Sequence, residues 1–288
     1  MRAIFEKEFK SYFYSMNGYV YLAFSVVATA IYFVGNCVLS GSTNFAAYVL
    51  GYNTLVLLIS IPILTMKLMA EEKRQKTDQL LFTAPVHTWE IVVGKYLAAL
   101  AMYGLSLAII MIFPCIIAVF GDINVLLTIN TLIGAFCLGA GMIAIGLFIS
   151  CITEHQMIAA IFSFVIFFLM FMLNYITDMF PGDAIFTVAF LSVAALLIGF
   201  IFYRETKDKK ISIGIFVVLE AVIVGLYLWK AELFDNGFAN MISWISLSDR
   251  YQNFISGVFQ LSSVIYYISF VVIALGLAIQ LIEHRRWK

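Results

Sequence analysis

The sequence predicts an all-α polytopic membrane protein with about eight transmembrane helices. Hydrophobic residues make up 63% of the 288 residues and charged residues only 12%, against roughly 25% charged residues in soluble domains. The mean hydropathy is +1.01, and residues 11–66 contain no Asp, Glu, Lys or Arg. This composition excludes a soluble fold and a disordered chain. The 17 basic and 17 acidic residues cancel, so the net charge gives no reason to expect nucleic acid as a partner.

The individual spans follow from the length of a membrane-crossing helix. About 20 apolar residues are needed, because every backbone amide must be hydrogen-bonded within the segment. Segments that meet this requirement with little or no charge lie at 19–39, 45–66, 96–120, 125–152, 157–176, 184–203, 211–229 and 261–282. Residues 1–288 therefore form a single transmembrane domain. For the sixth and seventh segments, a partly re-entrant pair is the alternative.

The distribution of basic residues predicts the orientation. With the N-terminus in the cytoplasm and eight spans, 15 of the 17 Lys and Arg residues fall on the cytoplasmic side, and only Lys230 and Arg250 fall outside. The positive-inside rule thus predicts that both termini are cytoplasmic. The first apolar segment is longer than the core of a signal peptide and lacks an Ala-x-Ala-like cleavage site, so we expect it to be retained as a span.

An amphipathic stretch precedes the first span. Residues 1–16 are expected to form a helix at the cytoplasmic membrane interface. Its polar side carries Arg2, Glu6, Lys7 and Lys10, and its apolar side, at helical spacing, carries Ile4, Phe5, Phe9, Tyr12 and Phe13.

No catalytic or metal-binding motif is present in the sequence. The four cysteines, which include no C-x-x-C pair and are interpreted as packing residues, are Cys37, Cys115, Cys137 and Cys151. A phosphate-binding loop would need a glycine five residues before the Gly94-Lys95 pair, where Trp89 stands. We therefore predict no catalytic residue, no metal site and no cofactor in this chain.

The longest cytoplasmic connection, residues 71–94, changes character halfway. Its first half is charged, with Glu71, Glu72, Lys73, Arg74, Lys76 and Asp78, and its second half is apolar, with Leu80, Leu81, Phe82, Ala84, Pro85 and Val86. Exposed apolar residues in a charged frame favour docking onto another surface; packing beneath the chain's own bundle is the alternative. Because proline ends one helix and can begin another, a second short helix is expected over 86–93.

This loop carries a family resemblance. The string EEKRQKTDQLLFTAPV, followed by EIVVGKYLAAL, resembles the segment after the second span of ABC-2 type permeases, the membrane subunits of ATP-binding-cassette exporters. IFEKEFKSYFYSMNGYV and SDRYQNFISGVFQLSSVIYYISF resemble the same family, particularly its gliding-motility and nitrous-oxide-reductase-maturation permeases. Two departures stand out: many relatives have Gly-Thr in place of Lys76-Thr77, and many have six spans, so residues 184–229 resemble an added helical hairpin.

The resemblance implies a type-V-exporter-like fold in the bacterial cytoplasmic membrane. It also implies that residues 77–90 carry a coupling helix for a separate ATPase subunit. The implied docking residues are Glu71, Glu72, Thr77, Leu80, Leu81, Phe82, Pro85, Val86 and Glu90. The implied partners are two copies of that ATPase, which hold ATP and magnesium, a second permease chain in a homo- or heterodimer, and an auxiliary subunit.

Several residues inside the predicted spans are candidates for a pathway or a hinge. Pro62 and Pro114 each remove a backbone donor and are expected to kink the second and third spans; kinks in a static bundle are the alternative. Glu220 is the only ionisable residue deep within a predicted span, and no basic residue lies in any span, so a neutral, hydrogen-bonded carboxyl is favoured. Small residues of the fourth span are expected to pack within the chain rather than at a dimer interface: Gly134, Ala135, Gly139, Ala140, Gly141, Ala144 and Gly146.

The external segment, residues 231–260, is aromatic and amphipathic. Ser248 is expected to cap a helix over 249–259, and the apolar side chains are expected at the headgroup level: Phe234, Phe238, Met241, Trp244, Ile245, Tyr251, Phe254 and Phe259. In the resembled family this region is an external gate and an auxiliary-subunit contact.

The leading functional interpretation is the permease subunit of an ATP-driven exporter. Within the same family, the alternative is a mechanical or scaffolding complex that acts on envelope components without passing a solute. The alternative from another class is an ion-coupled secondary transporter with Glu220 as proton carrier. Secondary transporters need several polar groups at the membrane midplane, whereas this chain offers one acid.

Overall fold

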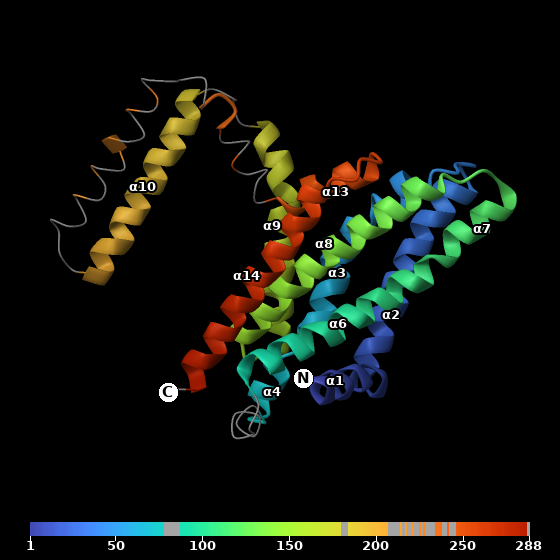
Figure 1. Cartoon of the computed structure of the whole chain (residues 1–288), viewed down its shortest axis with the longest axis horizontal. Coiled ribbons are helices and arrows are strands. Elements are labelled where there is room, and N and C mark those ends of the chain that lie inside the picture. The colour runs from blue at the N-terminus through green and yellow to red at the C-terminus, as the bar shows by residue number, and fades with distance from the viewer. Residues whose placement is uncertain are drawn as a thin grey trace. The chain divides into compact units, whose positions relative to one another are not determined.

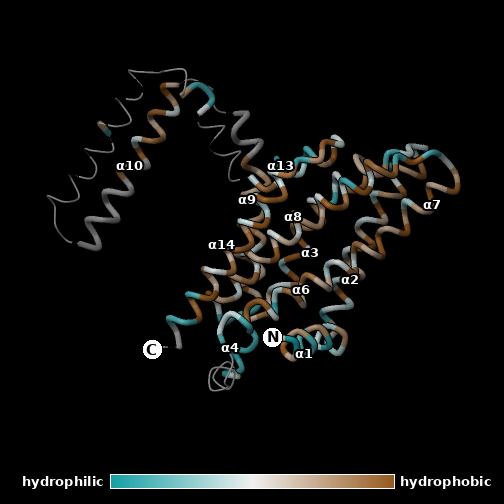
Figure 2. The backbone as a smooth tube through the Cα atoms, viewed as in Figure 1, coloured by the Kyte–Doolittle hydropathy of each residue, from teal (hydrophilic) through white to brown (hydrophobic). Residues whose placement is uncertain are grey.

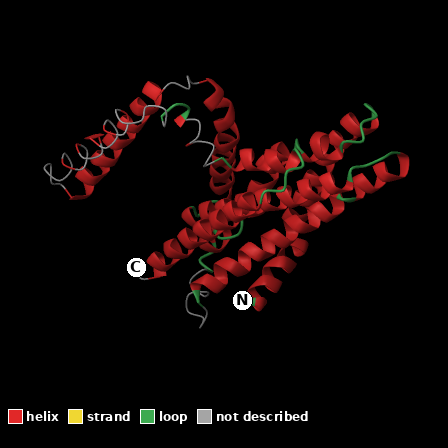
Figure 3. Ribbon diagram, turned by 45° about the horizontal axis from the view of Figure 1, so that its top comes forward, coloured by secondary structure: helices red, strands yellow, loops and turns green. Residues whose placement is uncertain are grey.

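The computed structural model describes residues 1–77, 87–179, 184–206, 214, 217, 220, 221, 225, 227, 234–237, 241 and 246–286. Throughout these residues the regular secondary structure is helical (Figure 3). The chain divides into two compact units, one of Met1–Met170 with Leu247–Lys288 and the other of Phe171–Ser246. The prediction of an all-α polytopic protein is confirmed.

The first unit is a bundle built around one central helix. Its elements are α1 (Arg2–Tyr14), α2 (Met16–Phe33), the π-helical turns η1 (Val34–Val38) and η2 (Ala46–Leu50), α3 (Asn53–Thr65), α4 (Ala70–Arg74), α6 (Thr88–Ile110), α7 (Ile112–Phe120), α8 (Val125–Ile152), the first part of α9 (Gln156–Met179), α13 (Leu247–Ile255) and α14 (Leu261–Arg286). The central helix α8 packs against α14, α13, α3 and α6. Within this unit, α1, α4 and the C-terminal end of α14 lie at one end, and α7 and α13 lie at the other (Figure 1).

Six helices among the described residues are long and apolar enough to cross a membrane: Met16–Val38, Asn53–Arg74, Thr88–Phe120, Val125–Ile152, Gln156–Leu173 and Leu261–His284. They overlap the first five predicted spans and the last. Figure 2 shows hydrophobic residues along them and hydrophilic residues at α1 and α4. In the second unit, α10 (Ala184–Thr206) occupies the predicted sixth span. Its first part, Ala184–Val193, is an apolar helix too short by itself to cross a membrane. Most of the predicted seventh span lies outside the described residues.

The second and third spans differ from the prediction in where they begin. The second span begins at Asn53 rather than at residue 45, because η2 ends at Leu50 and a turn separates it from α3. The separate short helix expected over 86–93 is wrong. Helix α6 starts at Thr88 and continues to Ile110, since this stretch contains no proline to interrupt it.

The two prolines of the predicted kinks lie in different surroundings. Pro114 is in the first turn of α7, where the missing N–H would have no partner within the helix. The third span therefore breaks at Met111, three residues before the proline. Pro62 lies inside α3, which ends at Thr65 before the chain turns into α4.

The small residues of α8 make contacts within the chain, as expected. A Cβ added to Gly134 would lie 2.6 Å from Phe254 Cβ on α13, and one added to Gly139 would overlap the buried ring of Tyr103 on α6. These glycines let neighbouring helices approach the central helix closely.

Helix α13 is inserted into the bundle instead of lying on its surface. Tyr251 and Phe254 are buried against neighbouring elements of the chain. Their depth at the headgroup level remains a prediction. Tyr251 donates its hydroxyl to Leu50 O at 2.7 Å, and Phe254 O accepts hydrogen bonds from Asn130 Nδ2 and Thr131 Oγ1, each at 3.1 Å. These hydrogen bonds join α13 to η2 and α8. The helix begins at Leu247, so Ser248 lies in its first turn rather than before it.

Candidate functional site

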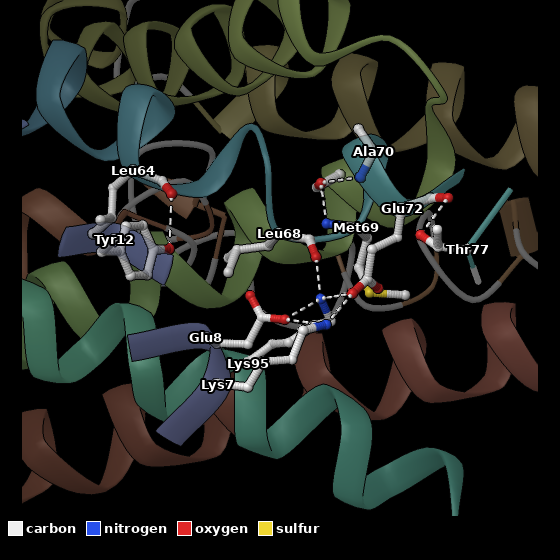
Figure 4. Close-up of polar contacts among 11 residues, drawn as sticks. Lys7, Glu8, Tyr12, Leu64, Leu68, Met69, Ala70, Glu72, Thr77 and Lys95 are labelled. Carbon is white, nitrogen blue, oxygen red and sulfur yellow. Dashed lines mark hydrogen bonds and ion pairs between the residues drawn. The ribbon is translucent and has the colours of Figure 1, made fainter. Parts of the chain in front are cut away.

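The second span is interrupted between α3 and α4, and this interruption organises one end of the bundle. It frees backbone groups that a continuous helix would pair. Lys95 Nζ of α6 donates to Leu68 O at 2.7 Å, and Ser150 Oγ of α8 accepts from Met69 N and Ala70 N at 3.0 Å each (Figure 4). Side chains from two neighbouring helices therefore hold the interruption in place.

Lys95 is the centre of an ion-pair cluster, which we define as Lys7, Glu8, Glu72 and Lys95. The Lys95 side chain is only 1% exposed, and its Nζ lies 3.0 Å from Glu8 Oε1 and 2.9 Å from Glu72 Oε1. Lys7 Nζ approaches the same two carboxylate oxygens from the outside, at 3.5 and 3.3 Å. The cluster joins α1, α4 and α6 and balances two positive charges against two negative ones (Figure 4).

The cluster gives the buried ammonium both hydrogen bonds and charge partners. Lys95 Nζ donates hydrogen bonds to Glu8 Oε1 and Leu68 O, and it is also ion-paired with the Glu72 carboxylate. A charge this deeply buried persists only when it is paired and hydrogen-bonded in this way. Partial burial lowers the pKa of Lys7, but attraction by Glu72 and Glu8 outweighs it, so the Lys7 pKa lies above its usual 10.5.

Helix α1 is attached to the bundle through one face. Ile4, Glu8 and Tyr12 recur every four residues and so share that face. A Cβ on Gly94 of α6 would lie 3.1 Å from Ile4 Cγ2, and Tyr12 donates its hydroxyl to Leu64 O of α3 at 3.1 Å. Burial raises the Tyr12 pKa well above its ordinary value, so the hydroxyl remains a donor.

The end of α4 shapes the start of the loop. Lys76 has a left-handed backbone with φ of 56°. Thr77 N donates to Glu72 O at 3.0 Å and Lys76 N donates to Lys73 O at 3.1 Å, which together form a Schellman motif. Glycine is the usual residue at the left-handed position of this motif, and Lys76 is the position where many relatives in the resembled family have glycine. Lys73 also donates its ammonium to Cys151 O of α8.

Four of the predicted docking residues lie in the described part of the chain. Glu72 is 13% exposed and faces the two lysines of the cluster. Glu71 is partly exposed and lies 3.9 Å from Lys67 Nζ. Glu90 is in the first turn of α6, where the helix dipole favours a negative charge. Thr77 makes the outer hydrogen bond of the Schellman motif at the end of α4, from its N–H to Glu72 O. The other predicted docking residues lie outside the described residues: Leu80, Leu81, Phe82, Pro85 and Val86.

The three pathway or hinge candidates are divided between the two units of the chain. Pro62 and Pro114 belong to the first unit, and Glu220 belongs to the second. Within the second unit, Glu220 Oε2 accepts a hydrogen bond from Ser192 Oγ of α10 at 3.2 Å. The carboxyl group thus has a polar partner on a neighbouring helix.

The sequence reasoning missed Glu8, Lys95 and Ser150. The expectation that no basic residue lies in a span is wrong, because Lys95 is inside the third. A signal for the cluster was present: Glu8 lies four residues after Ile4 and four before Tyr12, so it places a charge on the apolar face of the first helix. Such a charge predicts a buried partner of opposite sign.

Comparison with known families identifies the chain at the level of family. The model of the ABC-2 family transporter proteins matches residues 2–181, more than half of the chain. The matched range includes the whole ion-pair cluster and the interrupted second span. No curated protein matches the chain. The family match shows that this polytopic membrane protein belongs to the ABC-2 family of transporter proteins.

Proposed function

We propose that this chain is the permease subunit of an ATP-driven exporter, which forms half of the transmembrane pathway and docks a separate ATPase subunit through residues 77–90. One observation carries the proposal. Glu72 and Lys95 flank the loop that the resemblance assigns to docking, and their side chains are ion-paired 2.9 Å apart. A force applied to the loop therefore reaches α4 and α6 together, and reaches α1 through Glu8.

The interruption between α3 and α4 supplies a hinge for this movement. Three of its backbone groups, Leu68 O, Met69 N and Ala70 N, are held by the side chains of Lys95 and Ser150. Side-chain hydrogen bonds of this kind can be exchanged without unwinding a helix. Closure of the ATPase on ATP would displace the loop, and the spans that contain Pro62 and Pro114 would transmit the displacement across the membrane.

The proposed location is the bacterial cytoplasmic membrane, with both termini in the cytoplasm. Support comes from the end of the first unit where α1, α4 and the C-terminal end of α14 lie (Figure 1). Basic residues gather there, namely Arg2, Lys7, Lys10, Lys67, Lys73, Arg74, Lys76 and Lys95, whereas Arg250 of α13 lies at the other end. This asymmetry is the one expected for a cytoplasmic face.

The proposed assembly contains two permease chains, in a homo- or heterodimer, and two ATPase subunits that hold ATP and magnesium. An auxiliary subunit at the external side is a further proposed partner. ATP hydrolysis is thereby assigned to the partner subunit, and this chain contributes docking, force transmission and the pathway.

The proposal is tested by purifying the full-length tagged chain from its native host in a mild detergent and identifying stoichiometric partners by mass spectrometry. We expect a soluble subunit with a G-x-x-x-x-G-K-[ST] loop. Leu81→Asp, or replacement of both Phe82 and Val86 by Asp, should abolish its co-purification, because a charge in the apolar patch opposes burial at the interface. Leu39→Asp is the matched control. It also puts an Asp in place of an exposed leucine, but at the end of the first span that is farther from α1 and from the loop.

Two results would overturn the proposal. Normal ATPase co-purification with Leu81→Asp and with the double variant would remove the docking assignment. A chain that purifies alone and moves protons into liposomes in a Glu220-dependent way would make the ion-coupled transporter the better interpretation.

A further inference from the structure

A groove of about 630 Å³ opens where the start of α1 packs against α6. Helix α1 contributes Arg2 and Phe5 to its lining, and α8 contributes Phe136. Helix α6 contributes two leucines and two small residues, Leu97, Leu100, Ala101 and Gly104. All lining side chains except Arg2 are apolar, so the groove suits a hydrocarbon chain with a cation beside it.

The sequence of α6 explains why the chain itself does not fill the groove. The four α6 residues of the lining are spaced i, i+3, i+4 and i+7, and therefore share one face of the helix. They are partly exposed, whereas Ala99 and Met102 between them are buried. Among the described residues, a Cβ added to Gly104 would meet only Phe136 Cε2, at 3.9 Å. The small side chains thus leave a hollow on the surface of the third span.

The groove lies at the depth of one leaflet of a bilayer. A Cβ on Gly94 would lie 3.1 Å from Ile4 Cγ2, so the start of α1 lies beside the first part of the third span. From Leu97 to Gly104 the helix rises about 10 Å, at about 1.5 Å per residue. This length fits within the roughly 15 Å of hydrocarbon in one leaflet. A lipid whose headgroup is level with α1 would therefore place an acyl chain in the groove.

Arg2 provides a phosphate-binding group at the shallow end of the groove. Its side chain is 92% exposed, and its Nε donates to Glu6 Oε1 at 2.8 Å. A guanidinium has five N–H donors and binds a phosphate through two parallel hydrogen bonds, for which the two Nη groups are available. An exposed ion pair contributes little free energy, so Glu6 does not prevent a phosphate from binding. The Glu90 carboxylate is balanced by the Met1 ammonium, 4.0 Å away.

We propose that this groove binds an anionic phospholipid, with one acyl chain along the α6 face that ends at Gly104 and the phosphate on the Arg2 guanidinium. The headgroup of phosphatidylglycerol carries a phosphate and no ammonium. Its charge is therefore not cancelled internally, and it attracts Arg2 more strongly than phosphatidylethanolamine or phosphatidylcholine does. The site belongs to this chain alone, so it does not depend on the docking of an ATPase.

The test uses the full-length chain in nanodiscs that contain equal amounts of phosphatidylglycerol, phosphatidylethanolamine and phosphatidylcholine. After transfer to a mild detergent, native mass spectrometry identifies and counts the lipids that remain bound to each chain. We expect phosphatidylglycerol to be retained about threefold over each of the other two lipids, the factor expected for one exposed charge pair. Equal retention of the three lipids by the unmodified chain would overturn the proposal.

Two variants separate the headgroup from the acyl chain. Arg2→Gln should abolish the preference for phosphatidylglycerol, whereas Lys10→Gln, which removes an exposed lysine of α1 outside the groove lining, should keep it. Gly104→Leu should fill the groove and lower the number of retained lipids by about one per chain. Gly276→Leu is the matched control, because Gly276 of α14 also has open space around a new Cβ but lies outside the groove lining.

Three other outcomes would each overturn the proposal. Undiminished lipid retention by Gly104→Leu would place the lipid elsewhere. A preference for phosphatidylglycerol that survives Arg2→Gln would remove Arg2 as the phosphate-binding group. An unmodified chain that forms a dimer without bound lipid, and that Gly104→Leu converts to a monomer, would assign the groove to an interface between two copies.

Discussion

Lys95 and Glu72 lie at opposite ends of the loop between the second and third spans, and their ion pair, with an Nζ–Oε1 distance of 2.9 Å, closes the loop at its base. Because Glu8 bonds to the same ammonium, the helix that precedes the first span is part of this closure. The geometry of α1, α4 and α6 is thus set by one buried side chain.

Replacement of that side chain should be strongly destabilising. Lys95→Met leaves the Glu8 and Glu72 carboxylates, which are 14% and 13% exposed, with the 64% exposed Lys7 as their remaining cation. We expect a loss of about 3–5 kcal/mol in the free energy of unfolding, the range for breaking a buried pair. Denaturant titration of the purified protein measures it, with Lys10→Met as control. A loss below about 1 kcal/mol would mean that water solvates the two carboxylates.

The attachment of α1 should weaken at alkaline pH. Burial raises the folded-state pKa of Tyr12 above its ordinary value of 10.0. Its stabilising contribution is therefore complete below pH 10 and is lost as the pH rises through the folded-state pKa. The difference in unfolding free energy between the unmodified chain and Tyr12→Phe should be constant from pH 7 to about 9 and shrink above about 10. A constant difference across that range would show that Tyr12 is accessible to water.

The fold was largely predictable because the membrane imposes a simple rule on length and composition. Helix α8 begins and ends at the predicted residues, since Asn124 Oδ1 caps its start by accepting from Leu127 N at 3.0 Å and its apolar run ends at Ile152. The interruption of the second span was not predictable in this way. Its stabilising partners, Lys95 and Ser150, come from distant segments, and local hydropathy carries no information about them.

The candidate site was predictable in part. The resemblance selected the loop and its flanking acids Glu71 and Glu72, but it did not reveal that Glu72 pairs with Lys95. Lys95 directly precedes a charge-free stretch, so the sequence places it among the basic residues of the cytoplasmic side rather than inside a span. Only the position of Glu8 on an apolar face could have indicated that a buried cation exists.

The left-handed residue at the end of α4 gives a prediction of increased stability. Lys76 has φ of 56°, a conformation that costs about 1–2 kcal/mol for a residue with a Cβ. Lys76→Gly removes this strain but increases the entropy of the unfolded chain, so a net gain of about 0.5–1 kcal/mol is expected. Lys76→Ala is the control for loss of the lysine side chain and should bring no such gain. Equal effects of the two substitutions would assign the change to charge rather than to backbone conformation.

Glu220 gives a prediction that separates a structural role from a transport role. Glu220→Gln keeps an oxygen that can accept from Ser192 Oγ, so the free energy of unfolding should change by less than about 0.5 kcal/mol and assembly should persist. Ser192→Ala removes the donor and should cost about 1 kcal/mol. Transport by the Glu220→Gln variant, measured in proteoliposomes, should equal that of the unmodified chain. Loss of transport with normal folding would instead favour a proton-carrying carboxyl.

Two glycines that both lie inside membrane helices should respond differently to the same substitution. A Cβ at Gly139 would overlap the ring of Tyr103, which cannot move aside because it is buried and donates its hydroxyl to Ala135 O at 2.7 Å. We expect Gly139→Ala to lower the free energy of unfolding by about 1–3 kcal/mol through overpacking. At Gly104 the nearest side-chain atom, in the ring of Phe136, would be 3.9 Å from the new Cβ, so Gly104→Ala should be neutral or stabilising by up to about 1 kcal/mol. Denaturant titration of both variants compares them directly, and equal effects would mean that the contact between α6 and α8 is looser than the Tyr103–Gly139 packing requires.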